Sequence, residues 1–65
     1  MQKAKKEVYK DFYGCRAVIT RYKVGTAKLV IYTPNGAIII KKKYGSYRGC
    51  MIAMGKSSDG WRLVA

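Results

Sequence analysis

Apolar residues gather in three stretches of the chain, with charged and polar residues among or after them, which is the pattern of β-strands between turns. The stretches cover residues 15–24, 27–33 and 37–44 and are rich in Val, Ile, Thr and Tyr, which pack well on a pleated sheet. Short connections, Gly25-Thr26 and Pro34-Asn35-Gly36, separate them, and the Asn-Gly pair can adopt the positive φ angles of a tight hairpin turn. The pattern therefore predicts a three-stranded antiparallel β-meander.

The spacing of apolar residues changes from two to about 3.6 after Gly45, which indicates a helix. Ser46 is suited to the N-cap, and Gly55 stands where a C-cap glycine is expected. We predict a short helix over residues 47–54. Its apolar face consists of Tyr47, Cys50, Met51 and Met54.

The two ends of the chain are less regular. Residues 57–60 have the composition of a turn, and residues 61–64 are expected to form a short strand with Trp61 in the core. Residues 8–13 fit a turn or two of amphipathic helix, while residues 7–13 also fit an extension of the first strand, and both alternatives stay open. The lysine-rich residues 1–7 are predicted to be a flexible basic arm.

These elements predict one small α+β domain spanning residues 1–65: a three-stranded antiparallel meander packed on one short helix, with a short C-terminal fourth strand. The helix must cover the more apolar face of the sheet. We expect that face to contain Cys15, Ala17, Ile19, Leu29, Ile31, Ile38 and Ile40. The opposite face is expected to carry Arg16, Val18, Thr20, Tyr22, Lys28, Val30, Tyr32, Ile39, Lys41 and Lys43.

The charge of the chain points to a polyanionic partner. Fourteen Lys and Arg residues against three acids give a formal net charge of +11. Neutralising this charge with DNA or RNA releases condensed counterions and favours binding. Lys and Arg contact phosphates, and Tyr rings stack on unpaired bases. The predicted nucleic-acid-binding residues are Arg16, Tyr22, Lys28, Tyr32, Lys41 and Lys43 on the sheet, and Lys3, Lys5 and Lys6 in the arm.

Two other partners fit the same face. The first alternative is a protein–protein interaction module or inhibitor, such as a phage-encoded one, that docks on an acidic or nucleic-acid-binding surface of a host protein. Alternatively, Val18, Val30, Tyr32 and Ile39 form the interface of a homodimer or pack on the N-terminal segment, because exposed apolar patches often mark interfaces.

Other functions lack the residues that they need. The chain has no His and three acids, so we expect no enzyme, no metal site and no cofactor. Cys15 and Cys50 are expected as small core residues, and a single disulfide bridge between them is the alternative. The longest apolar run, residues 37–40, is too short to span a membrane, and no secretory signal begins the sequence, which favours the cytoplasm.

From residue 15 to residue 54 the order of elements resembles the sheet-reading DNA-binding domains of ethylene-response-type plant factors and of some phage and transposon integrases. In those domains the sheet lies in the major groove. The chain carries no motif of these families, and the junction at residues 44–48 departs from the helix start of double-stranded RNA-binding domains. Its size and basicity suit an accessory or regulatory protein of a phage or mobile element.

Overall fold

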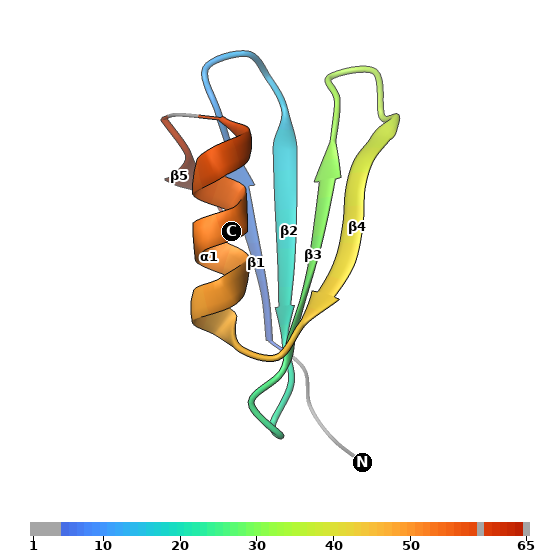
Figure 1. Cartoon of the computed structure of the whole chain (residues 1–65). Coiled ribbons are helices and arrows are strands. Elements are labelled where there is room, and N and C mark those ends of the chain that lie inside the picture. Colours follow the sequence, from blue (N-terminus) through green and yellow to red (C-terminus); the bar gives the residue numbers. More distant parts are fainter. Residues whose placement is uncertain (1–4, 59, 65) are drawn as a thin grey trace.

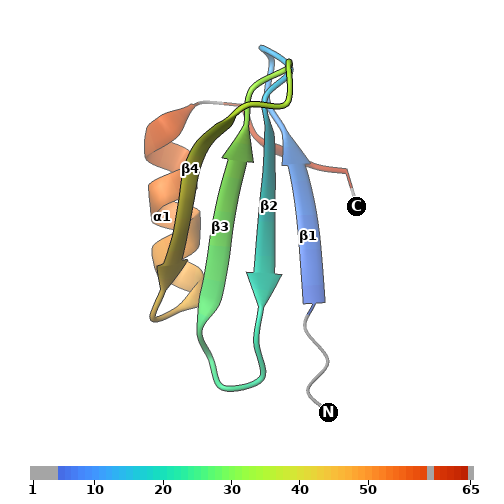
Figure 2. The ribbon, with the colours of Figure 1, turned by 90° about the vertical axis from the view of Figure 1, so that its right-hand side faces the viewer.

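The computed structural model describes residues 5–58 and 60–64. Within them a five-stranded antiparallel sheet has one face covered by a helix (Figure 1). The elements are β1 (Lys5–Lys10), β2 (Arg16–Arg21), β3 (Ala27–Tyr32), β4 (Ile38–Tyr44), α1 (Tyr47–Ser57) and β5 (Arg62–Leu63). The strand order is β4-β3-β2-β1-β5. In Figure 2, turned by 90° from the view of Figure 1, the four long strands lie in front and the helix lies behind them.

The predicted α+β class is confirmed, and the sheet is larger than predicted. The three expected strands are present with shorter bounds, and the short C-terminal strand is β5. The sequence pattern did not indicate β1 as a separate strand. It placed residues 5–7 in a flexible arm, whereas they pair with β2, Lys6 opposite Thr20 and Glu7 opposite Ile19. The remaining arm residues, including Lys3, lie outside the described residues, as does Asp59 of the predicted turn.

The three hairpins that join β1 to β4 share one turn design. In each, a positive-φ glycine donates its amide to the carbonyl three residues before it, at 3.4 Å for Gly14, 3.0 Å for Gly25 and 2.9 Å for Gly36. This is the pattern of a three-residue loop with a glycine bulge. Among the described residues only glycines have positive φ, so the prediction that Asn35 would share this role is wrong. Because Gly36 alone supplies the positive φ, Asn35 is an ordinary turn residue.

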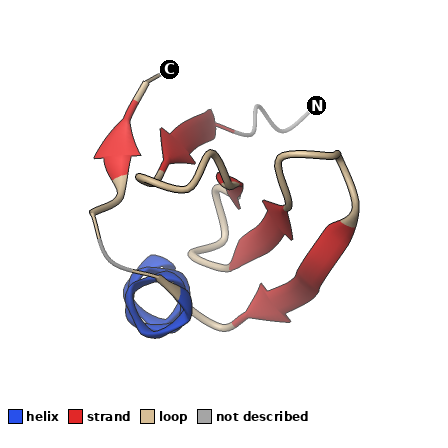
Figure 3. Ribbon diagram, turned by 90° about the horizontal axis from the view of Figure 1, so that it is seen from above, coloured by secondary structure: helices blue, strands red, loops and turns tan. Residues whose placement is uncertain are grey.

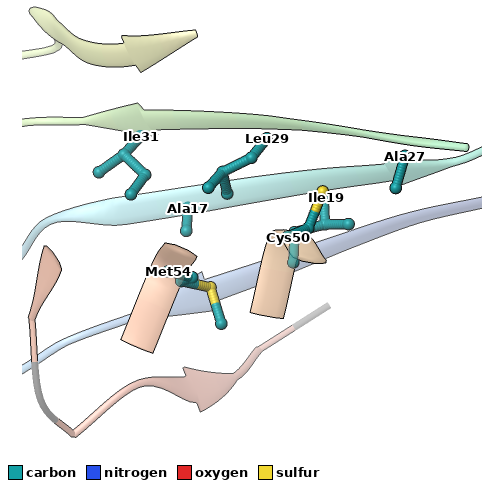
Figure 4. Packing of buried hydrophobic residues seen from close by; sticks show 7 residues of the cluster. All are labelled: Ala17, Ile19, Ala27, Leu29, Ile31, Cys50 and Met54. Atoms are coloured by element: carbon teal, nitrogen blue, oxygen red, sulfur yellow. The ribbon is translucent and has the colours of Figure 1, made fainter. Parts of the chain in front are cut away.

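The core lies between the sheet and α1 and consists of small and branched aliphatic side chains together with one methionine (Figure 4). Ile19, Leu29 and Cys50 are completely buried, and Ile31 is 1% exposed. The other buried members of the cluster are Ala17, Ala27 and Met54. Five residues predicted to face the core are only partly buried: Cys15, Ile40, Tyr47, Met51 and Trp61. Both cysteines are free thiols.

Ile38 was expected in the core and is 54% exposed. A β-bulge explains the difference. Ile31 pairs with Ile40, while the next residue, Tyr32, pairs with Ile38, so Ile39 is the extra residue of β4. The bulge moves Ile38 to the face opposite the core, next to Tyr32, because an inserted residue inverts the alternation along a strand.

The helix begins as predicted and ends later. The Ser46 hydroxyl accepts a hydrogen bond from the Gly49 amide at 3.1 Å, as an N-cap does. Gly55, predicted as the C-cap, lies inside the helix, which continues to Ser57. The strand that follows the helix, β5, lies beside β1 at the edge of the sheet away from β4 (Figure 3). Trp61 is partly buried against the core, and its indole Nε1 donates to the Met54 carbonyl at 2.8 Å, which satisfies a helix-end acceptor.

Candidate nucleic-acid interface

The face of the sheet away from α1 collects side chains from all five strands. Residues directly opposite each other in an antiparallel pair share a face, so the register assigns every position. We call this surface the open face. It consists of Lys6, Val8 and Lys10 from β1, Arg16, Val18 and Thr20 from β2, Lys28, Val30 and Tyr32 from β3, Ile38, Lys41 and Lys43 from β4, and Arg62 from β5.

The open face has an apolar centre between two basic rows. Val8, Val18 and Val30 are consecutive cross-strand partners, and each is partly buried. Successive rows on one face are about 7 Å apart, since two residues separate them along each strand. One neighbouring row holds Lys6, Thr20, Lys28 and Lys43. The other holds Arg62, Lys10, Arg16, Tyr32 and Ile38, while Lys41 ends the valine row.

The described acids lie away from this face. Glu7 is on the helix side of β1, where its Oε1 accepts hydrogen bonds from the hydroxyls of Tyr47 at 2.6 Å and Tyr9 at 2.9 Å. Its Oε2 lies 3.6 Å from an Arg21 guanidinium nitrogen, and that guanidinium stacks 4.0 Å above the Tyr47 ring. The hydrogen bond from Tyr47 is the largest cause that lowers the pKa of Glu7. This cluster ties β1 to α1.

Asp11 is 7% exposed and holds the first hairpin together. Its Oδ1 accepts from the amides of Tyr13 at 2.9 Å and Cys15 at 2.8 Å, and its Oδ2 accepts from the Ser58 hydroxyl at 2.7 Å. Burial raises the pKa of Asp11, but these hydrogen bonds outweigh it and leave the pKa below its ordinary value. The described acids are therefore ionised and engaged in structural contacts. The open face has no acidic side chain among the described residues.

The predicted sheet residues come together on one surface. Arg16, Lys28, Tyr32, Lys41 and Lys43 all lie on the open face. Tyr22, predicted as part of the first strand, instead begins the β2–β3 turn, where its amide donates to the Thr26 carbonyl at 3.0 Å. It still adjoins this surface, because the Lys43 ammonium lies 5.6 Å from the centre of the Tyr22 ring.

The two described lysines of the predicted basic arm, Lys5 and Lys6, lie on opposite sides of the sheet. Lys6 lies on the open face, opposite Thr20. Lys5 lies opposite Arg21, on the side that α1 covers. Lys42 is also on that side, 5.5 Å from the centre of the Tyr44 ring, so the run of three lysines sends two side chains to the open face.

Lys10 and Arg62 were not among the nucleic-acid-binding residues predicted from the sequence. Both extend the row of Arg16, because Lys10 pairs with Arg16 on one side and with Arg62 on the other. The spacing of the glycines contained the missing signal. Gly14, Gly25 and Gly36 are eleven residues apart, so a third hairpin turn, and with it a strand before residue 11, was visible in the sequence.

A hollow of about 460 Å³ opens at the end of the face that the β1–β2 and β3–β4 loops border. Arg16, Val18 and Tyr32 line it from the open face. Gly14, Thr33, Pro34 and Gly36 line it from the loops. The two loops meet here, since a Cβ on Gly14 would lie 3.4 Å from Cγ of Pro34. The open face therefore has a concave feature at one end.

Comparisons with protein-family models, curated proteins and solved structures find no match to this chain. The described part of the chain contains no helix with the length and apolar character needed to cross a membrane. Within residues 5–58 and 60–64, no group of three or more His, Cys, Asp or Glu side chains is arranged to hold a metal ion.

Proposed function

We propose that this protein binds nucleic acid across the open face of its sheet. The observation that carries the proposal is the distribution of charge. Seven cations from five strands share this face with no described acid: Lys6, Lys10, Arg16, Lys28, Lys41, Lys43 and Arg62. A surface of this kind attracts phosphates, and binding releases the counterions condensed on the nucleic acid. Tyr32 and the valine row add groups that contact bases or sugars.

The proposal is tested by comparing two pairs of charge-removing substitutions. Lys41→Gln/Lys43→Gln removes two exposed cations from the open face, and Arg48→Gln/Lys56→Gln removes two exposed cations from α1. Both doubles change the net charge equally. If Lys41 and Lys43 contact phosphates, the first double weakens binding to a fluorescein-labelled 20-nucleotide DNA or RNA and lowers the slope of log K against log salt by about 1.4–1.8.

The control double is expected to keep most of the affinity and the slope of the unchanged protein. Equal losses in the two doubles would mean that only net charge matters, and the open face would lose its assignment. Absence of binding to every oligonucleotide at low salt would exclude nucleic acid as the partner.

A protein partner with an acidic surface is the second candidate, favoured by the apolar content of the same face. Val8, Val18 and Val30 form its centre, and Ile38 and Ile39 are each 54% exposed at one edge. A second copy of the chain fits less well, because two faces with seven cations each repel. Capture of one acidic protein at a fixed stoichiometry, after nuclease treatment and with no oligonucleotide binding, would favour this candidate.

A further inference from the structure

The hollow at the loop end of the open face has the lining that a flat aromatic ligand needs. Tyr32 is partly buried there, and Arg16 lies directly opposite it on β2. Side chains in that relation have Cβ atoms about 4.5–5.5 Å apart. Tyrosine rings and guanidinium planes are surfaces on which unpaired bases stack. Arg16 and Tyr32 thus offer a cation and an aromatic ring side by side.

The loops keep this hollow open. Gly14 and Gly36 are at positive φ, +86° and +91°, which their turns require, and they bring no side chain to the rim. Pro34 packs beside Gly14 and closes the gap between the loops. The volume of about 460 Å³ is within the range of roughly 300–1,000 Å³ typical of sites for small organic molecules. One nucleobase with part of its sugar fits this space.

A path for a sugar–phosphate backbone leads to the hollow. Arg62, Lys10 and Arg16 occupy the same row on β5, β1 and β2, and the row continues to Tyr32 on β3. Neighbouring strands are about 4.8 Å apart, so the three cations form a continuous basic track that ends at the ring.

We propose that the hollow binds one unpaired base of a single-stranded nucleic acid, which stacks on Tyr32 while Arg16, Lys10 and Arg62 contact its phosphates. The proposal rests on the nucleic-acid function above and names its substrate class. A duplex fits the hollow poorly, because a paired base must first leave the stack, which is costly. The valine row favours the same choice, since exposed base faces are apolar and duplex backbones are not.

The lining also predicts weak discrimination between bases. The amides of Gly14 and Gly36 already donate to the Asp11 and Thr33 carbonyls, and the Thr33 hydroxyl accepts from the Ala37 amide at 3.0 Å. Few polar groups are left to read base edges, so stacking supplies most of the contact. Homopolymers of different bases should then bind with similar affinity.

The test measures fluorescence anisotropy with labelled (dT)12, (rU)12 and a 12-base-pair duplex at one salt concentration. We expect the full chain to bind a single strand at least tenfold tighter than the duplex, and the two single-stranded arms separate DNA from RNA. Tyr32→Ala should weaken single-strand binding by about tenfold or more with an unchanged salt slope. Tyr32→Phe, which keeps the ring, should restore it.

Phe12→Ala is the matched control, since Phe12 is 78% exposed and lies outside the hollow, with its ring against Gly60. On adding (dT)12, the changes in NMR amide chemical shift should be largest at Gly14, Tyr32 and Gly36.

The proposal is overturned if duplex and single strand bind equally, or if Tyr32→Ala behaves like Phe12→Ala. If one of these results is obtained but Lys41→Gln/Lys43→Gln still weakens binding, only the single-strand proposal fails, and the proposal that the open face binds nucleic acid is retained. Absence of binding to all three probes overturns both proposals.

Discussion

The Ser58 hydroxyl donates a 2.7 Å hydrogen bond to Oδ2 of Asp11, which joins the residue after α1 to the first hairpin. The other carboxylate oxygen of Asp11 accepts the amides of Tyr13 and Cys15. One side chain therefore fixes the turn between β1 and β2 and ties the helix end to it.

We expect Asp11→Ala to lower the free energy of unfolding by about 2–3 kcal/mol, because it removes charge-assisted hydrogen bonds from a buried site. Ser58→Ala removes one of these bonds and leaves both amide contacts, so its cost should be about 1 kcal/mol. Urea unfolding at pH 7 measures both values. Equal costs would contradict the assignment of the turn amides as the larger part of the Asp11 contribution.

Stability should fall in acid. Hydrogen bonds, led by that of Tyr47 for Glu7, hold the pKa values of Glu7 and Asp11 below their ordinary 4.5 and 3.8. Both groups therefore bind protons more weakly in the folded state than in the unfolded chain. Their contribution is complete above the unfolded pKa values and is lost as pH falls through the folded ones.

The measurement is urea unfolding at several pH values between 7 and 2.5. Glu7→Gln/Asp11→Asn should be less stable than the unchanged protein at pH 7 and should lose less stability on acidification. An unchanged protein that is equally stable at pH 7 and pH 2.5 would be incompatible with the lowered pKa values.

The hairpin glycines should be sensitive to alanine. Gly25 and Gly36 have φ of +96° and +91°, where a Cβ is strained even though nothing lies within 4 Å of it. We expect Gly25→Ala and Gly36→Ala each to cost about 1–2 kcal/mol. A Cβ on Gly45 would also meet open space, and the φ angle of Gly45 is not positive. Gly45→Ala should therefore be neutral or slightly stabilising. Thermal unfolding of the three variants measures these costs. Equal losses of stability at Gly45 and Gly36 would contradict the turn assignment.

Adjacent residues of β2 provide a test of the two faces. Ile19 is completely buried under α1, while Val18 is partly buried on the open face. Ile19→Ala should lower the free energy of unfolding by about 2–5 kcal/mol through loss of burial and a cavity. Val18→Ala should cost clearly less, because its site is already partly solvated. If Val18→Ala is the more damaging change, the open face is covered in solution.

The sequence predicted the middle of the sheet well, because β2 and β3 are rich in Val, Ile, Thr and Tyr and lie between short glycine-containing turns. It missed β1 because the helix-facing side of that strand is polar. Lys5, Glu7 and Tyr9 occupy that side, and Glu7 is stabilised by Tyr47, a partner 40 residues away. No local pattern reveals such a contact.

Which residues belong to the candidate site depends on which face of the sheet each strand position occupies. A short run of apolar residues does not always define that face. Lys41 and Lys43 were placed on the correct face because the register beyond the bulge is regular. Ile38, Ile39 and Ile40 are equally apolar, so nothing in this run marked the bulge or the shift of Ile38. The hollow was also beyond sequence analysis, since it arises where two loops meet.

The order of the strands also bears on synthesis of the chain at the ribosome. Each of the strands β2, β3 and β4 pairs with the strand that precedes it in sequence, so each hairpin can close soon after its second strand emerges. The cover of the sheet comes later, because Cys50, Met54 and Trp61 all follow the last long strand. A nascent chain that ends before α1 therefore presents Ile19, Leu29 and Ile31 to water.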